Sequence, residues 1–211
     1  MNWMNLSNSF LPIFCAIMFT LIPAGPLSAQ QGTLDKLREK FEAGEVFRGG
    51  FMHRYIDSYT QDTTSSRGEI WVGGDKYKVR TANQTVVVDG ETSMVYNENR
   101  KRLIISNYEP SEDDFAPSRI LSGIDSTFTV NRQEKQGGSI SLVLVSDDPF
   151  AIYQRVEVVL SPSLNPQEIV ALDPADNTIV TSFENGQFIK AEQGMFHLDY
   201  PEGTEVIDMR N

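Results

Sequence analysis

Two histidines, His53 and His197, are the only imidazole groups in the chain, so acid–base or metal chemistry that needs histidine must use them. Each lies in a stretch where apolar and polar residues alternate, which is typical of a β-strand. A single histidine in a strand is more often an ordinary surface or half-buried group than a catalytic one. We therefore expect neither histidine to be catalytic.

Two pairs of carboxylates could instead suggest a cation site. Asp113-Asp114 follows Ser111 and fits the first turn of a helix, where acids stabilise the N-terminus, and Asp147-Asp148 precedes a proline and fits a turn. The sequence has no Gly-x-Ser-x-Gly elbow, no phosphate-binding glycine loop and no His-Glu-x-x-His motif. We therefore expect no enzyme, no cofactor and no metal site.

The N-terminal region resembles an export signal. Residues 10–27 are almost continuously apolar and lead to Leu27-Ser28-Ala29, so we expect a signal peptide over 1–29, cleavage after Ala29 and a periplasmic domain over 30–211. No Lys or Arg precedes the apolar run, and the alternative is an uncleaved membrane anchor. The only cysteine, Cys15, lies inside this leader, so the remaining chain has no disulfide or thiolate chemistry.

The chain is acidic, with a formal net charge of −11 and a pI of about 4.6. No basic stripe is evident in the sequence, so we expect no binding to nucleic acid and no attachment to anionic lipid by charge alone. The same charge also serves solubility in any exported protein. Residues 30–211 suffice for one domain with a buried core.

The periodicity of apolar residues changes once along the chain. Leu34, Leu37 and Phe41 predict an amphipathic helix that begins near Thr33 and stops at Gly44. From Phe47 onward the period is two, as in β-strands. We predict strands near residues 47–57, 66–73, 75–82, 84–89, 92–97, 101–106, 125–135, 139–146, 153–161, 167–173, 178–183 and 187–200.

Glycine-containing pairs separate several of these strands. Asp89-Gly90, Gly137-Gly138 and Asn185-Gly186 supply the positive φ that tight hairpins need, which predicts a mostly antiparallel meander. A second helical segment is expected over residues 111–123. A dozen strands with so few helices must curve around an apolar interior that the helices cannot fill, which favours an open barrel with a cavity. The alternative is a sandwich with a solid core.

The order of these segments resembles the outer-membrane lipoprotein carrier family, LolA, over nearly all of residues 30–211. The segments that carry the resemblance are Phe47–His53, Arg67–Val72 leading into Tyr77–Arg80, Val88–Asn97 with its Asp-Gly turn, and the closing Phe196–Asp208. In this family a basic pair commonly follows the second strand, where this chain has Gly73-Gly74, and His53 stands where glutamine is frequent.

This resemblance implies a mainly β fold, in which a single antiparallel sheet curves into an unclosed half-barrel and short helices form a lid over an apolar cavity. It implies a monomeric carrier that takes lipoproteins from an inner-membrane ABC release complex, holds their acyl chains and passes them to an outer-membrane acceptor. A carrier of another lipid, such as a glycolipid or pigment ester, and a periplasmic lipid-sensing regulator remain alternatives.

The apolar residues of the early strands are the candidates for the cavity wall, although each could equally belong to a solid core. The predicted lining consists of Phe47, Phe51, Ile70, Val72, Tyr77, Val79, Val87, Met94 and Tyr96, and the predicted lid residues are Phe115, Ile120 and Leu121.

Overall fold

One helix precedes the sheet in the computed structural model, which describes residues 27–109, 128–148 and 151–210. The predicted helix is present as α1 (Leu27–Glu42), which begins before Thr33. It stops at Gly44, whose φ of 78° suits glycine and whose N–H donates to the carbonyl of Phe41. Within the described ranges, no helix is long and apolar enough to cross a membrane.

The described strands form one sheet. In spatial order the strands are β12, β6, β5, β4, β3, β2, β1, β11, β10, β9, β8 and β7, and neighbours are antiparallel except for the parallel pair β12–β6. Their bounds are β1 (Glu45–Ile56), β2 (Thr63–Val72), β3 (Tyr77–Thr81), β4 (Gln84–Val88), β5 (Thr92–Asn97), β6 (Arg102–Asn107), β7 (Phe128–Gln136), β8 (Ser139–Ser146), β9 (Arg155–Leu160), β10 (Pro166–Leu172), β11 (Thr178–Lys190) and β12 (Glu205–Asp208).

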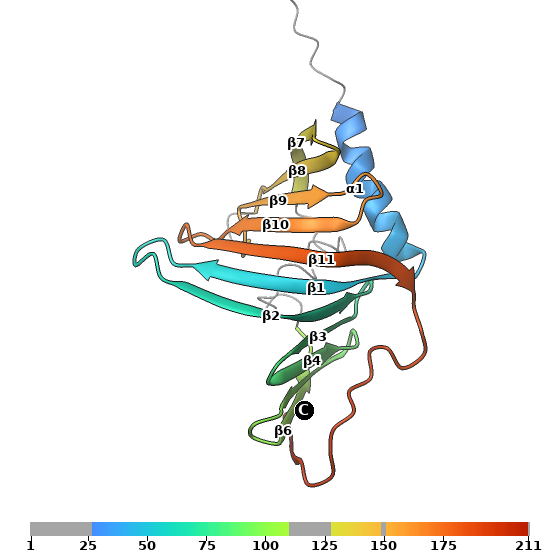
Figure 1. Ribbon diagram of the computed structural model, residues 1–211, viewed down its shortest axis with the longest axis vertical. Coiled ribbons are helices and arrows are strands. Elements are labelled where there is room, and N and C mark those ends of the chain that lie inside the picture. Colours follow the sequence, from blue (N-terminus) through green and yellow to red (C-terminus); the bar gives the residue numbers. More distant parts are fainter. Residues whose placement is uncertain (1–26, 110–127, 149–150, 211) are drawn as a thin grey trace, which may run out of the picture.

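The sheet twists strongly but does not close into a barrel. β7 and β12 lie at its two ends, and β3, β4 and β6 run steeply across the direction of β8–β11 (Figure 1). This confirms the mainly β, unclosed architecture. The predicted helical segment over 111–123 lies outside the described residues.

The prediction of a hairpin at Asn185-Gly186 is wrong. β11 continues through this pair from Thr178 to Lys190 beside β1, and the register shifts between Arg48 and Gly50. Asn185 has a φ of 53°, and Asn185-Gly186 forms a bulge opposite Gly49. The pair bends a long strand because the ladder to β1 resumes beyond it. By contrast, Gly90, Gly137 and Gly138 do adopt positive φ between successive strands.

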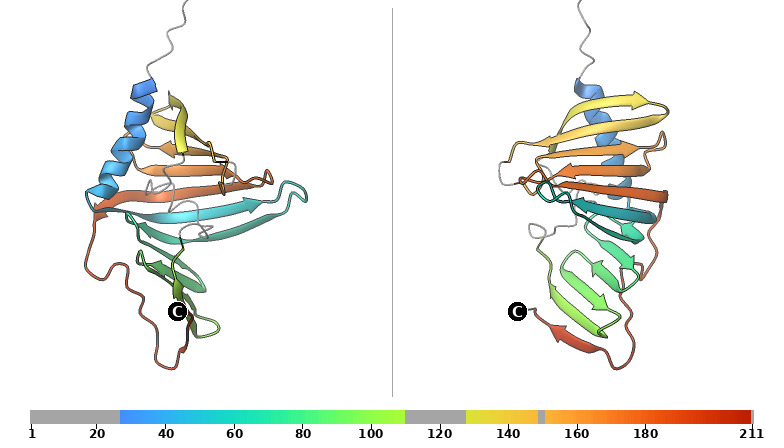
Figure 2. Two further views of the ribbon diagram at one scale, coloured as in Figure 1. Left: turned by 180° about the vertical axis from the view of Figure 1, so that it is seen from behind. Right: turned by 60° about the vertical axis from the view of Figure 1, so that its left-hand side comes forward.

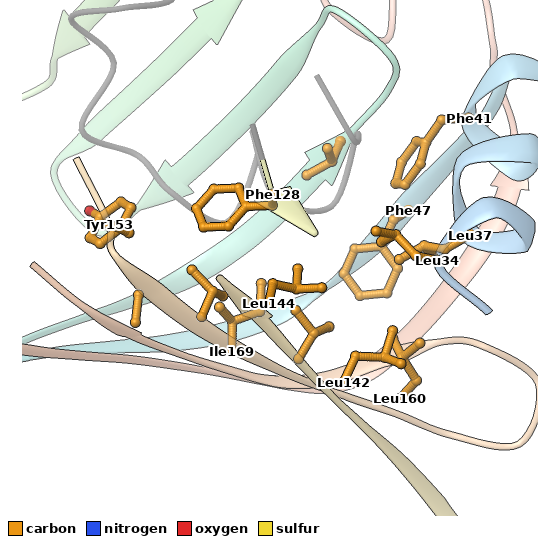
Figure 3. Packing of buried hydrophobic residues seen from close by; sticks show 14 of the residues in the cluster. Leu34, Leu37, Phe41, Phe47, Phe128, Leu142, Leu144, Tyr153, Leu160 and Ile169 are labelled. Atoms are coloured by element: carbon orange, nitrogen blue, oxygen red, sulfur yellow. The ribbon is translucent and has the colours of Figure 1, made fainter. Parts of the chain in front are cut away.

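Most buried apolar side chains project from one side of the sheet, which we call the inner face. The helix α1 packs against this face through Leu34, Leu37 and Phe41, which approach Phe47 (Figure 3). The cluster extends across the sheet as far as Phe128 of β7. The apolar side of the helix that the sequence predicted is therefore the side that packs against the sheet.

A smaller buried cluster lies on the opposite side, the outer face. It combines Val87, Tyr96 and Leu103 of β4–β6 with Leu198, which belongs to the segment that joins β11 to β12. We call residues 191–204 the strap. The strap crosses from the end of β11 to the far edge of the sheet (Figure 2), and the Lys78 side chain donates to the carbonyl of its His197 at 3.0 Å.

Candidate functional site

The inner face is the candidate binding surface. Six of the nine residues predicted to line a cavity belong to its cluster: Phe47, Phe51, Ile70, Val72, Tyr77 and Val79. Strand register explains why they gather, since Phe47 lies opposite Val72, and Val72 opposite Tyr77. Every second residue of each strand therefore points to the same face, and these residues form apolar rows across β1–β3.

The face extends well beyond the predicted residues. It continues onto β4 through Val88 and across β8–β11 through Leu142, Val156, Ile169 and Ile179. Sequence reasoning missed these positions because it ranked only the early strands, although the alternation in 140–144 and 156–160 carried the same signal.

Aromatic rings connect the helix to the two central strands. The ring centroid of Phe47 lies 5.2 Å from that of Phe183 and 5.7 Å from that of Phe188, and Phe41 of α1 lies 5.3 Å from Phe188. Two of these contacts are edge-to-face, an arrangement that adds about 0.5–1.5 kcal/mol to the burial of each pair. Phe47 is fully buried and forms the centre of this contact.

The structure does not bring the other three predicted lining residues to the inner face. Val87, Met94 and Tyr96 pack in the outer-face cluster with Leu198. Their neighbours Val86 and Val88 point the other way, into the inner-face cluster. The cause is that β4 is apolar on both faces, so its sequence does not show which face is inward. The predicted lid residues Phe115, Ile120 and Leu121 lie outside the described residues.

The inner face also carries a polar pair on its two central strands. His53 and Thr181 pair across β1 and β11, and Nδ1 of His53 lies 2.9 Å from Oγ1 of Thr181. Thr181 is fully buried, and burial lowers the pKa of His53 below its ordinary value of 6.5. The two histidines are far from equivalent, since His197 is on the exposed strap, with Nε2 3.4 Å from Asp199. Among the described residues, no group of three His, Cys, Asp or Glu side chains is arranged to hold a metal ion.

Comparison with known proteins identifies a curated relative. The chain is 20% identical over 190 residues to the outer-membrane lipoprotein carrier protein of Alcanivorax borkumensis, and the match covers 83% of this chain and 88% of that protein. The chain resembles this lipoprotein carrier protein over most of its length. No protein-family profile matches it.

Solved structures resemble this chain to different degrees. An uncharacterized conserved protein from Thermus thermophilus superposes with a TM-score of 0.56 at 11% identity, over 86% of this chain and 99% of that one. A LolA superfamily protein from Nitrosomonas europaea gives a TM-score of 0.48 at 13% identity, over 81% and 98% of the two chains. At these identities the Thermus likeness establishes the fold alone.

Proposed function

We propose that the chain is a periplasmic carrier that binds the acyl chains of lipoproteins against its inner face and transfers them from the inner to the outer membrane. The main support for this proposal is the extent of the apolar inner face in a sheet that does not close into a barrel. Apolar rows run from β4 to β7, and α1 packs against this face at β1 and β7. The resemblance to a lipoprotein carrier protein supports the same role.

The energetics favour such a carrier. An acyl chain in water exposes methylene groups at a cost of about 0.8 kcal/mol each. An apolar sheet face removes that cost through non-directional contacts, so it accepts chains of different length without a specific hydrogen-bond pattern. The proposed role needs binding and release but no bond cleavage, and we propose no catalytic residue.

Export and delivery complete the proposal. We propose that residues 1–29 are a cleaved signal peptide, that 30–211 form the carrier domain, and that the chain acts as a monomer. Its proposed partners are an inner-membrane ABC release complex and an outer-membrane acceptor. The lid is proposed to include Phe115, Ile120 and Leu121.

Native mass spectrometry of the protein purified from its own periplasm tests this function. A bound polypeptide that carries acyl chains would support the lipoprotein carrier. A bound free glycolipid or pigment ester would replace it with a carrier of another lipid. Protein that is consistently empty, even after addition of an acylated peptide, would count against both carriers and favour a regulator.

A further inference from the structure

A basic surface occupies the outer face of β1–β3. The residues that alternate with the inner-face rows point outward here, and Arg48 and Lys78 both lie opposite Trp71 in the strand register. The chain as a whole has a net charge of −11, so this surface contrasts with the rest of the molecule. The basic residues at outward positions of these strands are Arg48, Arg54, Arg67, Lys78 and Arg80.

Trp71 is the centre of this surface. The charged groups of Arg48, Arg80 and Lys78 lie 5.4, 5.5 and 6.0 Å from the centroid of its ring, within the range of cation–π attraction. Glu69 forms an ion pair with Arg80 and lies 3.6 Å from Arg48, and the hydrogen bond from Arg80 lowers the pKa of Glu69. One carboxylate balances only one of the three cations, so the group retains positive charge.

The surface is hollowed beside Trp71. A hollow of about 360 Å³ is lined by Arg48, Trp71 and Met195, and an adjoining hollow of about 520 Å³ is lined by Lys101 and Tyr96. Both hollows share Lys78 and Arg80, so they adjoin each other between the sheet and the strap, and the Lys78 side chain reaches across to the carbonyl of His197. We call the two hollows together the groove. Acidic residues also line the groove: Glu192 and Asp199 belong to the strap, and Glu98 belongs to the turn after β5. The basic side chains of the strands therefore form the floor of the groove, and the acidic side chains of the strap and of the turn after β5 form its walls.

This arrangement points to a peptide rather than a membrane surface. An acidic peptide offers carboxylates to the floor cations, backbone N–H groups to the wall carboxylates, and apolar side chains to Trp71 and Met195. Trp, Arg and Met side chains are also enriched at protein interfaces. A flat anionic bilayer cannot enter a groove, and it would repel a chain of net charge −11. We propose that the groove beside Trp71 binds a short acidic segment of a partner protein. This site lies on the opposite face from the proposed acyl-binding surface and does not depend on it.

Tryptophan fluorescence tests the proposal directly. The chain has two tryptophans, and Trp3 lies within the proposed signal peptide, so Trp71 is the only tryptophan of the cleaved protein, and Trp3→Phe makes it so in the full chain. A short peptide in which glutamate alternates with leucine is titrated into this protein, and the same peptide with glutamine for glutamate serves as its control. We expect the acidic peptide alone to shift the emission of Trp71, with binding that weakens as salt rises from about 0.05 to about 0.5 M.

Charge variants then locate the site. Lys78→Gln and Arg48→Gln should each weaken the acidic peptide about tenfold, because each removes a charge-assisted contact. Arg155→Gln is the matched control, since Arg155 is an exposed arginine on β9, at a distance along the sheet, and it should leave affinity unchanged. Circular dichroism checks that each variant is folded.

Three outcomes of the peptide titrations would overturn the proposal. They are an unchanged Trp71 emission, equal affinity for the glutamine peptide, and full affinity in the folded Lys78→Gln protein. Binding of phosphatidylglycerol vesicles without binding of the peptide would also overturn it, in favour of a membrane-facing site.

Discussion

The Nδ1 atom of His53 lies 2.9 Å from the Oγ1 atom of Thr181, on neighbouring central strands of the sheet. The two residues are 128 positions apart in the sequence, yet the pairing of β1 with β11 places them opposite each other. Both side chains point to the inner face, where His53 lies half-buried between Phe51 and Tyr55 of β1. A titratable group is thereby held where water has limited access.

The first prediction follows from the pKa of His53. Burial lowers this pKa below 6.5, so the neutral imidazole is favoured in the folded state. Between the folded and unfolded pKa values the unfolded chain binds more protons, and the free energy of unfolding therefore rises with pH. We expect the part of the free energy of unfolding that depends on neutral His53 to be fully present above pH 6.5. This part should be lost as pH falls through 6.5 toward the lowered pKa of His53.

Urea unfolding between pH 5 and pH 7.5 measures this dependence. The His53→Gln protein should show a flatter dependence of stability on pH than the parent. His197→Gln, which changes the exposed histidine of the strap, controls for the loss of a histidine elsewhere in the chain. Identical slopes in the parent and His53→Gln proteins would contradict the assignment.

The second prediction concerns the bulge in β11. A Cβ atom on Gly186 would lie 2.7 Å from Cζ of Phe47, and Phe47 cannot easily move because it is fully buried against Phe183 and Phe188. Gly186→Ala should therefore lower the free energy of unfolding by about 1–3 kcal/mol, as overpacking does. Gly74→Ala is the control, since nothing lies within 4 Å of its added Cβ. Thermal unfolding of both proteins would decide the matter, and equal melting temperatures would show that the core absorbs the methyl group.

The third prediction tests how α1 is attached. Leu37 is 1% exposed and faces the inner-face cluster, so Leu37→Ala should cost about 2–5 kcal/mol through lost burial and the cavity left behind. Lys36→Ala removes the exposed neighbour and should change stability by less than about 0.5 kcal/mol. Chemical denaturation monitored by circular dichroism gives both values. A loss below about 1 kcal/mol for Leu37→Ala would mean that the helix contributes little to the core.

The fourth prediction separates binding from folding. A carboxylate on the inner face should abolish binding of an acylated peptide, because a charge cannot be desolvated there without a partner. Val79→Glu is one such change, and Val86→Glu is a milder one because Val86 is only half-buried. Both proteins should keep the β signal in circular dichroism.

Thr85→Glu provides the matched control for Val86→Glu. Thr85 is the adjacent half-buried residue of β4, but it points to the outer face. Fluorescence titration with a dansyl-labelled acylated peptide should show loss of binding for the two valine variants and unchanged binding for Thr85→Glu. Retained binding in a folded Val79→Glu protein would refute the inner face as the acyl-binding surface.

Sequence periodicity determined the elements of this protein. The spacing of Leu34, Leu37 and Phe41 was sufficient to predict a helix and its buried side, because the side chains of a helix at that spacing share one face. Alternation located most of the strands, and the Asp89-Gly90 turn separates β4 from β5 as expected. The predicted strand over 187–200 is wrong beyond Lys190, where the strap begins, and β12 (Glu205–Asp208) was not predicted. A mainly β architecture followed from the number of strands, whereas its unclosed form was implied by the resemblance to the carrier family.

Only the tertiary structure decided which face each residue serves. In β4, Val86, Val87 and Val88 are all apolar, so alternation gives no direction there. Val87 lies on the outer face because Leu198, far along the chain, covers it. Likewise, Asn185-Gly186 satisfies the local rules for a hairpin, yet the long ladder to β1 holds β11 through it. Contacts between segments distant in sequence outweigh local preference in both cases, since they bury more apolar surface and satisfy more backbone hydrogen bonds.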